Sequence, residues 1–557
     1  MLFLYEKLRN VFMYNCMKNR IEILQNLKTV EKYIASAGVG FLTIFTYILL
    51  RRGNEWWPMV FLILSGIGIT VWGGNRSRII YIVLLGIFCC VERHFILHYG
   101  DGFREIGTQA LLTMHITDSD EILSYLSMLK IVEFFHPIIF LTVLVVVLHW
   151  KSEPLAGRLR KSAILFSFSF FLAMLFFICW RPVCDYLKDW KNLKAFLVRR
   201  EQFRFQAQDL KPEEKSVYFL VIGESHRKNE FDEIVLEKGA APLLSQARRE
   251  NTLWEFDDMI SYYQQTWFSV FTLLSRRGGG DQTIFFPEKG LFSLFREAGY
   301  KVYYITYQRK GLSATGYDNI VNEANVYINH RDSSFRRFDD GMLPVVDRIL
   351  RSDEKKVLIV IKMVGCHFNY HDRFPDEEKF QLYQPCYNEH NFSGYRIEDK
   401  KILQNTYYNA MYFSGKFLNG VAERCAKLTC PSMMLFVSDH GVINYDDGKN
   451  PFFGAARSNY HIPCIIFMND DFRDNLSHEV KDTLRKNRFL PVGNDYVFDT
   501  FVTLAGIDYP GKRKAYDLTS PEVQPVENRK VWVWKHQIPY DSLPSYQEVD
   551  TTENLND

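Results

Sequence analysis

The sequence has almost no net charge and, after residue 181, no long apolar run. Its 557 residues hold 67 lysines and arginines against 65 aspartates and glutamates, a formal net charge of +2. This balance lacks the basic excess with which proteins bind nucleic acids, so we expect no nucleic-acid partner. No internal repeat is found, and residues 1–32 are too polar to hold a cleavable signal peptide. The length suits two or three ordinary domains.

Long apolar runs are confined to the first 180 residues. Five of them come close to the roughly 20 residues that a bilayer-spanning helix needs, so we predict an N-terminal membrane domain, residues 1–180, with five transmembrane helices. Buried helices of a soluble core are the alternative, but they would leave little polar surface to face water. The five runs are residues 33–50, 56–72, 79–98, 131–149 and 162–180.

Basic residues predict the orientation of these helices. Lysines and arginines gather in residues 1–32 and again in residues 150–161, which lie on the same side if all five runs span. Positively charged loops stay on the cytoplasmic side. The odd number of spans then places the chain after residue 181 on the other side of the membrane.

Five cysteines lie after residue 215 of this predicted exported part, where disulfides can persist. Cys425 and Cys430 are close enough in sequence to close a small loop, and Cys366 with Cys386 forms the other candidate pair. Buried free thiols are the alternative for each. Cys464 lies within an apolar run, so we expect it in the core.

After residue 215, short apolar runs alternate with amphipathic segments, which is typical of a parallel sheet with helices on both faces. We therefore predict an α/β/α soluble domain at residues 215–540. Residues 181–214 mix aromatic and basic side chains, as a membrane-surface helix or linker does, and the polar residues 541–557 are predicted to be disordered. The expected strands are 216–222, 301–306, 356–362, 432–437 and 462–467, and the expected helices are 241–249, 290–298, 340–351, 400–424 and 495–504.

Two of the predicted strands end in side chains that bind metal ions. The first runs into Gly223-Glu224-Ser225 and the fourth into Ser438-Asp439-His440-Gly441. Open α/β sheets carry their chemistry at the carboxyl ends of the strands. Glu, Asp and His form a ligand set suited to zinc, so we predict a zinc site made by Glu224, Asp439 and His440.

A third segment, residues 261–277, is predicted to be a loop that enters a short helix near Thr266. Free backbone N–H groups at a helix N-terminus favour an anion, and a threonine hydroxyl becomes a nucleophile when a metal or base activates it. A simple helix-capping role is the alternative. Ser225 is kept as the other candidate nucleophile, and His461 as a further candidate ligand.

These motifs resemble the inner-membrane phosphoethanolamine transferases, a family of the alkaline phosphatase superfamily with a sulfatase-like domain. The resemblance covers nearly the whole chain. Gly223-Glu224-Ser225 resembles the family's Gly-Glu-Ser/Thr zinc motif, and Ser438-Asp439-His440-Gly441 matches its Asp-His-Gly motif. Thr266 falls where the family carries its nucleophile, which is also a zinc ligand.

Two further segments carry the resemblance. Thr117–Leu126 is similar to the family's Thr-Asn-x-x-Glu-Ala-x-Glu-Tyr-Leu element, which implies that Thr117 and Glu121 contribute to a lipid-headgroup site. Residues 364–375 are similar to its Gly-x-His…Arg-Tyr-Pro segment, which implies that His367 lies beside the transferred phosphate.

The resemblance implies zinc-dependent transfer of phosphoethanolamine from phosphatidylethanolamine, through a phosphoethanolamine-Thr266 intermediate, to lipid A, lipopolysaccharide core or another envelope glycan, with release of diacylglycerol. It implies a protein, which we expect to be monomeric, in the bacterial inner membrane, with its catalytic domain in the periplasm. A phosphoglycerol transferase or other phosphodiester hydrolase on the same fold is one alternative. A non-catalytic membrane-anchored binding protein is another.

The sequence departs from the family pattern after the Asp-His-Gly motif. Val442 stands where family members have Glu, and residues 451–457 lack the histidine that members carry there. The sequence therefore predicts one zinc ion and leaves a second ion open. The Cys/Ser-x-Pro-x-Arg setting of a sulfatase nucleophile is also absent, which argues against sulfate-ester hydrolysis.

Overall fold

The computed structural model describes residues 198–545 and a few isolated earlier positions, with short gaps at 282–285, 308–315, 330–337, 389–396, 447, 449–450, 453 and 534–535. The chain divides into two compact units, one of residues 1–114 and 129–190 and the other of residues 115–128 and 191–557. The five predicted transmembrane runs, apart from isolated positions, and the Thr117–Leu126 segment lie outside the described residues. Within the described part, no helix is both long and apolar enough for a membrane crossing.

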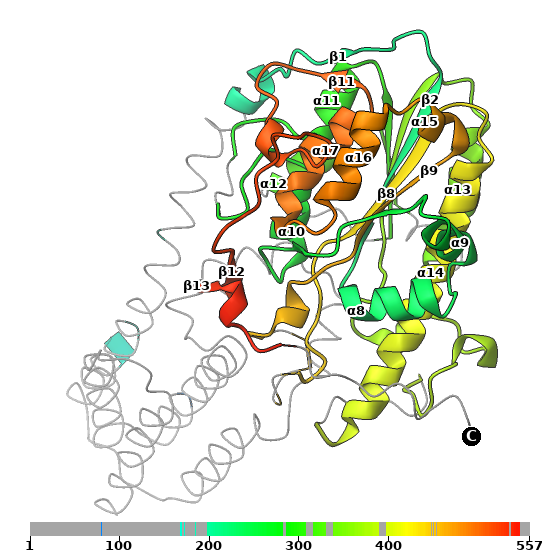
Figure 1. Ribbon diagram of the computed structural model, residues 1–557. Helices are drawn as coiled ribbons and strands as arrows, with labels where there is room; N and C mark the ends of the chain where they lie inside the picture. Colours follow the sequence, from blue (N-terminus) through cyan, green and yellow to red (C-terminus); the bar gives the residue numbers. More distant parts are fainter. Residues whose placement is uncertain are drawn as a thin grey trace, which may run out of the picture. The chain divides into compact units, whose positions relative to one another are not determined.

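A seven-stranded sheet forms the centre of the described part (Figure 1). The strand order is β3-β9-β8-β2-β7-β5-β6. The strands are β2 (Ser216–Gly223), β3 (Trp254–Glu255), β5 (Lys301–Thr306), β6 (Val326–Asn329), β7 (Lys356–Lys362), β8 (Ser432–Ser438) and β9 (Cys464–Met468).

The expected parallel sheet is confirmed for β8, β2, β7, β5 and β6, whereas β9 runs antiparallel to β8 and to β3. A parallel neighbour needs a crossover that returns the chain to the starting edge of the sheet, usually a helix. In the described part of the segment between β8 and β9, the helical structure is one short 3-10 turn, η8 (Arg457–Asn459). The chain therefore turns back, and β9 enters the sheet in the opposite direction.

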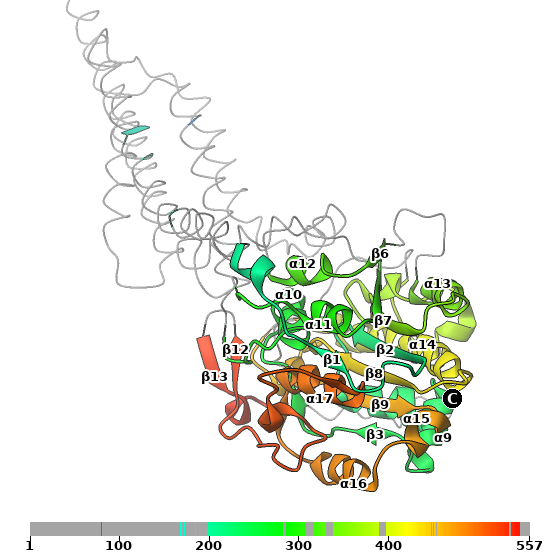
Figure 2. The ribbon, with the colours of Figure 1, turned by 90° about the horizontal axis from the view of Figure 1, so that it is seen from above.

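Helices cover both faces of the sheet (Figure 2). Strand β2 is buried along its whole length, because alternate side chains join two separate cores. Val217, Phe219 and Val221 pack on one side with α9 (Pro242–Arg249), α13 (Leu343–Leu350) and α14 (Lys400–Ala426). Tyr218, Leu220 and Ile222 pack on the other side with α10 (Thr266–Leu273), α11 (Leu291–Glu297), α12 (Gly316–Val321) and α17 (Val497–Leu504).

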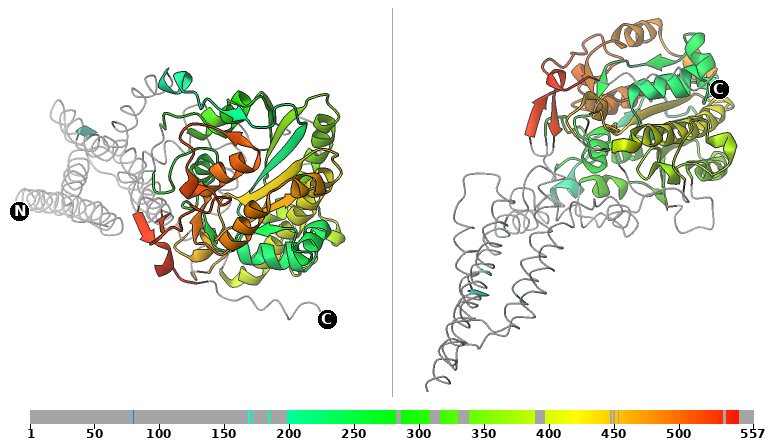
Figure 3. Two further views of the ribbon diagram at one scale, coloured as in Figure 1. Left: turned by 45° about the horizontal axis from the view of Figure 1, so that its top comes forward. Right: turned by 90° about the horizontal axis from the view of Figure 1, so that it is seen from below.

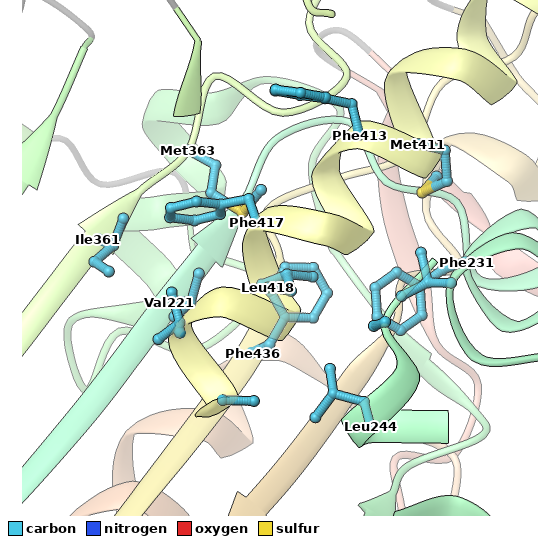
Figure 4. Packing of buried hydrophobic residues seen from close by; sticks show 14 of the residues in the cluster. Val221, Phe231, Leu244, Ile361, Met363, Met411, Phe413, Phe417, Leu418 and Phe436 are labelled. Atoms are coloured by element: carbon cyan, nitrogen blue, oxygen red, sulfur yellow. The ribbon is translucent and has the colours of Figure 1, made fainter. Parts of the chain in front are cut away.

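The first core is a close contact between α14 and the strand ends. Phe417 and Leu418 of α14 point toward Val221 of β2 and Phe436 of β8 (Figure 4). Two further views show the same arrangement of a sheet between helical layers (Figure 3). These buried strands hold the carboxyl edge of the sheet, where the candidate site residues lie, in a fixed position.

The remaining elements are short or lie at the edges of the domain. Sequence patterns did not predict most of them. They are β1 (Gln208–Asp209), α8 (Lys228–Glu230), η2 (Phe231–Glu237), β4 (Met259–Ile260), η4 (Asp339–Met342), η5 (Tyr370–Asp372), η6 (Glu378–Phe380), η7 (Ile397–Asp399), α15 (Asp470–Asp474), α16 (His478–Asn487), β10 (Val492–Gly493), η9 (Asn494–Tyr496), β11 (Ile507–Asp508), η10 (Lys514–Tyr516), β12 (Lys530–Val533), β13 (His536–Pro539) and η11 (Tyr540–Ser542).

The described cysteines are free thiols, which decides between the two alternatives left open by the sequence. Cys425 Sγ lies 3.1 Å from Ser432 Oγ, and burial raises the pKa of Cys425 to about 12. Cys366 and Cys464 are equally buried, the latter in the core as expected. Neither Cys425–Cys430 nor Cys366–Cys386 forms a disulfide.

Candidate metal centre

Neighbouring strands bring the predicted ligands together at the carboxyl edge of the sheet. Gly223 of β2 pairs with Ser438 of β8, so Glu224 and Asp439 each follow a paired residue and emerge side by side. His440 Nε2 lies 3.5 Å from Glu224 Oε1 and 3.8 Å from Asp439 Oδ2. The three side chains are buried, and the two carboxylates are wholly so.

The donor set fits a zinc ion. One ligand atom from each of Glu224, Asp439 and His440 lies within 4.8 Å of the other two. Carboxylate oxygens and an imidazole nitrogen are ligands that zinc accepts, and a hydroxyl or water can take the fourth position. Two buried carboxylates this close also need a positive charge, since burial of like charges without one is costly.

Backbone groups fix the Asp439 carboxylate. Its Oδ1 accepts hydrogen bonds from the backbone N–H groups of Ser225, at 3.1 Å, and His440, at 2.7 Å. Ser225 adopts a φ of +59° to present this N–H group. With Oδ1 occupied, Oδ2 is the oxygen that faces His440.

The tautomer of His440 leaves its outer nitrogen available. The Nδ1 atom lies 2.7 Å from the Gly441 carbonyl oxygen, which can only accept, so Nδ1 carries the proton and Nε2 carries the lone pair. Position 441 must be a glycine because the backbone there passes close to Ser458. A Cβ at this position would lie 2.0 Å from the Ser458 carbonyl oxygen. The glycine of the Asp-His-Gly motif therefore lets the chain pass beside Ser458.

Thr266 is the first residue of α10, as the sequence predicts, and its hydroxyl reaches the cluster. Thr266 Oγ1 lies 3.1 Å from Glu224 Oε2 and 3.3 Å from His440 Nε2. It is partly exposed, whereas the carboxylates are not. Thr266 thus lies on the side of the cluster that reaches solvent.

A buried serine ties α10 to the metal-ligand loop. Ser269, one turn after Thr266, donates a hydrogen bond to the backbone carbonyl of Asp439. The side-chain amide of Asn494 donates in turn to Ser269 Oγ at 2.9 Å. This connection fixes the start of α10 relative to Asp439, and the sequence patterns did not predict it.

Lys362 is the charged residue of the site that the sequence analysis missed. It ends β7 beside Ile222 of β2, and its Nζ lies 2.7 Å from Glu224 Oε2 and 3.0 Å from Asp439 Oδ2. Burial alone would lower the pKa of Lys362, but the Asp439 and Glu224 carboxylates raise it. Conversely, burial would raise the pKa of Glu224, but the Lys362 ammonium holds it well below its usual range. The available signal was a buried strand that ends in a charge, as at Glu224.

His367 lies on the loop that follows β7 and is half-buried. Burial lowers its pKa to about 4, against the opposing effect of the Glu224 charge. Its backbone carbonyl accepts a hydrogen bond from Arg373 Nε at 2.7 Å. Gly365, two residues before it, has a φ of +51°. The ring is neutral at physiological pH and lies near the cluster without belonging to it.

The other two candidate residues have different surroundings. Ser225 Oγ donates to Glu224 Oε1 at 2.9 Å, so this hydroxyl holds the carboxylate and is buried. His461 Nε2 lies 2.9 Å from the backbone carbonyl oxygen of Asp257, and His461 is not part of the three-residue cluster. The geometry favours Thr266 over Ser225 as the group that meets a substrate. Thr117 and Glu121 lie outside the described residues.

A sequence profile of the Sulfatase family matches residues 216–507, more than half of the chain. This chain belongs to the sulfatase family. The match spans the sheet, α10 and all three cluster ligands, so the site described above lies within the family's domain.

Relatives of known sequence extend the similarity beyond the sulfatase domain. Phosphoethanolamine transferase EptC of Escherichia coli is 20% identical over 575 residues, which cover 95% of this chain and 94% of the relative. Phosphoethanolamine transferase EptA of Helicobacter pylori is 24% identical over 270 residues, 46% of this chain and 49% of the relative. The resemblance to phosphoethanolamine transferases, members of an enzyme family, is therefore confirmed.

Two solved structures share the fold. The C-terminal periplasmic domain of EptC from Escherichia coli, in complex with Zn, aligns with a TM-score of 0.52 at 19% identity and covers 61% of this chain and 96% of that one. The integral membrane protein EptA from Neisseria meningitidis aligns with a TM-score of 0.58 at 16% identity, over 88% of this chain and 98% of that one. At these identities the likeness supports the sulfatase-type fold alone.

Proposed function

We propose that this sulfatase-family protein transfers phosphoethanolamine from phosphatidylethanolamine to an envelope glycolipid or glycan, through a covalent intermediate on Thr266. The observation that carries the proposal is the Thr266 hydroxyl, 3.1 Å from Glu224 Oε2 and 3.3 Å from His440 Nε2. Relatives that match this chain carry the name phosphoethanolamine transferase, which supports the choice of group transferred.

Glu224, Asp439, His440 and the Thr266 hydroxyl would hold one zinc ion. When bound, zinc would stabilise an ionised hydroxyl and the negative charge of a phosphoryl group. Glu224 and Asp439 are both paired with Lys362, and both would be ionised as zinc ligands. His440 would ligate through Nε2, since its Nδ1 is bonded to the Gly441 carbonyl oxygen.

Thr266 performs the bond-making step. Its hydroxyl donates a hydrogen bond to Glu224 Oε2, which would accept the proton as Oγ1 attacks the phosphorus and pass it to the departing diacylglycerol oxygen. The new Oγ–P bond replaces the bond from phosphorus to the diacylglycerol oxygen, which leaves with a proton. In the second step the acceptor's oxygen displaces Thr266, and the hydroxyl is restored. The first backbone N–H groups of α10 surround the phosphoryl oxygens.

The lipid substrates fit a protein held at a membrane. We propose a multi-pass monomer of the bacterial inner membrane, with residues 1–180 in the bilayer, residues 181–214 at its surface and a periplasmic catalytic domain at residues 215–540. Thr117 and Glu121 would bind the donor headgroup, and His367 would lie beside the transferred phosphate. Lipid A and the lipopolysaccharide core are the proposed acceptors, and a relative from Escherichia coli is named Kdo(2)-lipid A phosphoethanolamine 7''-transferase.

The decisive experiment looks for the intermediate. Purified full-length protein is incubated with phosphatidylethanolamine, digested and examined by mass spectrometry. We expect a phosphoethanolamine increment on the peptide that contains Thr266 and its loss in the Thr266→Ala variant. Thr272→Ala, on the same helix and donating to the Phe268 carbonyl, should keep the increment.

Cells provide the acceptor and a second test. Glycolipids from cells that express the wild-type protein should carry a phosphoethanolamine increment that Thr266→Ala cells lack. Persistence of the increment in those cells would exclude Thr266 as the nucleophile. A phosphoglycerol increment instead would identify the alternative transferase reaction on the same fold.

A further inference from the structure

The two carboxylates of the candidate metal centre meet a third charge inside the protein. Glu224 and Asp439 are wholly buried and come from neighbouring strands. Two anions cannot share a buried site at low cost without a cation beside them. Lys362, from the strand on the other side of β2, contacts both.

The hydrogen bonds of Lys362 leave no donor for a substrate. An ammonium group has three N–H donors, and Lys362 Nζ has three acceptors: Glu224 Oε2 at 2.7 Å, Asp439 Oδ2 at 3.0 Å and the Gly223 carbonyl oxygen at 3.0 Å. The side chain is 0% exposed. Lys362 therefore lies on the protein side of the carboxylates, while Thr266 is partly exposed on the solvent side.

Charge counting shows what this lysine changes. With both carboxylates ionised, as zinc ligation requires, they and the ammonium carry a charge of −1, and a zinc dication would bring the cluster to +1. Without the lysine the loaded cluster would be neutral, and it would offer less attraction to a phosphodiester of charge −1. Lys362 thus supplies a positive charge that would otherwise have to come from a second metal ion.

We propose that Lys362 is the internal counter-cation of this centre: it holds Glu224 and Asp439 together before zinc binds and lets the centre work with one metal ion. The proposal rests on the proposed zinc site. Lys362 is a positioning residue, since it acts through the two carboxylates and touches no substrate.

The chain contains a matched control on the same strand. Lys356 begins β7 as Lys362 ends it, and its Nζ pairs with Asp209 Oδ2 at 2.7 Å. Lys356 is also buried, at 9% exposed, but it lies at the opposite end of the strand from the cluster. Lys356→Met and Lys362→Met each remove one buried ammonium from β7, and only the second removal is next to the zinc ligands.

The experiment measures thermal unfolding of the purified full chain, free of metal and with zinc added. Without metal, both variants should melt lower than wild type by about 5–10 °C, because each leaves buried carboxylates without their partner. With zinc, the difference in melting temperature between Lys362→Met and wild type should become smaller, because zinc then neutralises Glu224 and Asp439. The difference in melting temperature between Lys356→Met and wild type should stay the same.

Two further readouts separate a role at the centre from a general structural role. Chelator competition should show one zinc per chain in both variants, bound by Lys362→Met at least as tightly as by wild type. The rate of Thr266 modification by phosphatidylethanolamine should fall in zinc-loaded Lys362→Met and stay at the wild-type value in Lys356→Met. If Lys362→Met does not fold, Lys362→Gln, which removes the charge and keeps an N–H donor, undergoes the same comparison.

The proposal would be overturned if zinc leaves the loss of melting temperature in Lys362→Met unchanged or makes it larger. Weaker zinc binding by this variant would also overturn it. Metal-free Lys362→Met as stable as wild type would overturn it too. If wild type binds no zinc, the proposed function fails instead, while the metal-free comparison still tests whether Lys362 holds the carboxylates.

Discussion

The hydrogen bond from Ser269 to the Asp439 carbonyl gives the sharpest test of how Thr266, the proposed nucleophile, is positioned. Ser269→Ala removes a wholly buried hydroxyl that donates to this carbonyl and accepts from Asn494 Nδ2 at 2.9 Å. Ser261 Oγ lies 3.0 Å away and also loses a neighbour. The substitution therefore breaks the contact between α10 and the loop that holds Asp439 and His440, two of the proposed zinc ligands.

The expected cost follows from the groups left behind. A buried polar group without its partner costs about 1–3 kcal/mol, and Ser269→Ala leaves the Asp439 carbonyl and the Asn494 amide in this state. We expect the free energy of unfolding to fall by about 2–4 kcal/mol. The rate of Thr266 modification should fall by about 10–100-fold, since a displacement near 1 Å at a reacting group has this order of effect.

Denaturant unfolding of the purified chain measures the free energy of unfolding. Mass spectrometry of the Thr266 peptide over time measures the rate of Thr266 modification. Ser245→Ala is the control: Ser245 is buried on α9 and donates to the Ala241 and Val235 carbonyls, which keep their backbone partners. Ser245→Ala should leave both the free energy of unfolding and the rate of Thr266 modification close to the wild-type values. A destabilised Ser269→Ala protein with an unchanged modification rate would refute the reasoning that this contact positions Thr266.

Three other substitutions or treatments have defined outcomes. Burial raises the pKa of Asp495 from 3.8 to about 6. Between about pH 4 and 6 the folded state keeps this proton while the unfolded chain loses it, so the free energy of unfolding should fall by up to about 3 kcal/mol as pH rises. Asp495→Asn should remove this part of the pH dependence in denaturant titrations. Gly441→Ala places a Cβ 2.0 Å from the Ser458 carbonyl oxygen, so metal analysis of the purified variant should find less zinc per chain. Cys425 and Cys430 are free thiols, so both should be alkylated in denatured protein that has not been reduced, and a disulfide-linked peptide would contradict the structure.

The sequence predicted the centre of the domain because buried strands leave a strong pattern. Strand β7 has the expected bounds, and α14 extends the expected helix by two residues at its end. Both are long and bury apolar side chains at a regular spacing. Glu224 and Asp439 were predictable for the same reason, since each directly follows such a strand.

Other parts left no comparable pattern. Helix α16 is mostly polar, with Thr483, Leu484 and Asn487 as its buried residues, and β3 and β4 are two residues long. The direction of β9 depends on the connection from β8, whose described residues hold only a short 3-10 turn, and apolar runs do not report this. Lys362 was missed because a lysine after an apolar run normally marks a strand end in water, and its burial depends on partners far away in the sequence.

The order of the strands along the chain has a consequence for how the centre is assembled during synthesis. Lys362 follows Glu224 by 138 residues, and Asp439 follows Lys362 by another 77. Contacts between such distant segments form slowly, because long loops must close first. Lys362 is therefore synthesised before Asp439, and Glu224 can meet its lysine partner on β7 before the second carboxylate joins the edge. The proposed zinc site is complete only when β8 has joined β2, so we expect any metal to be loaded late in the folding of this protein.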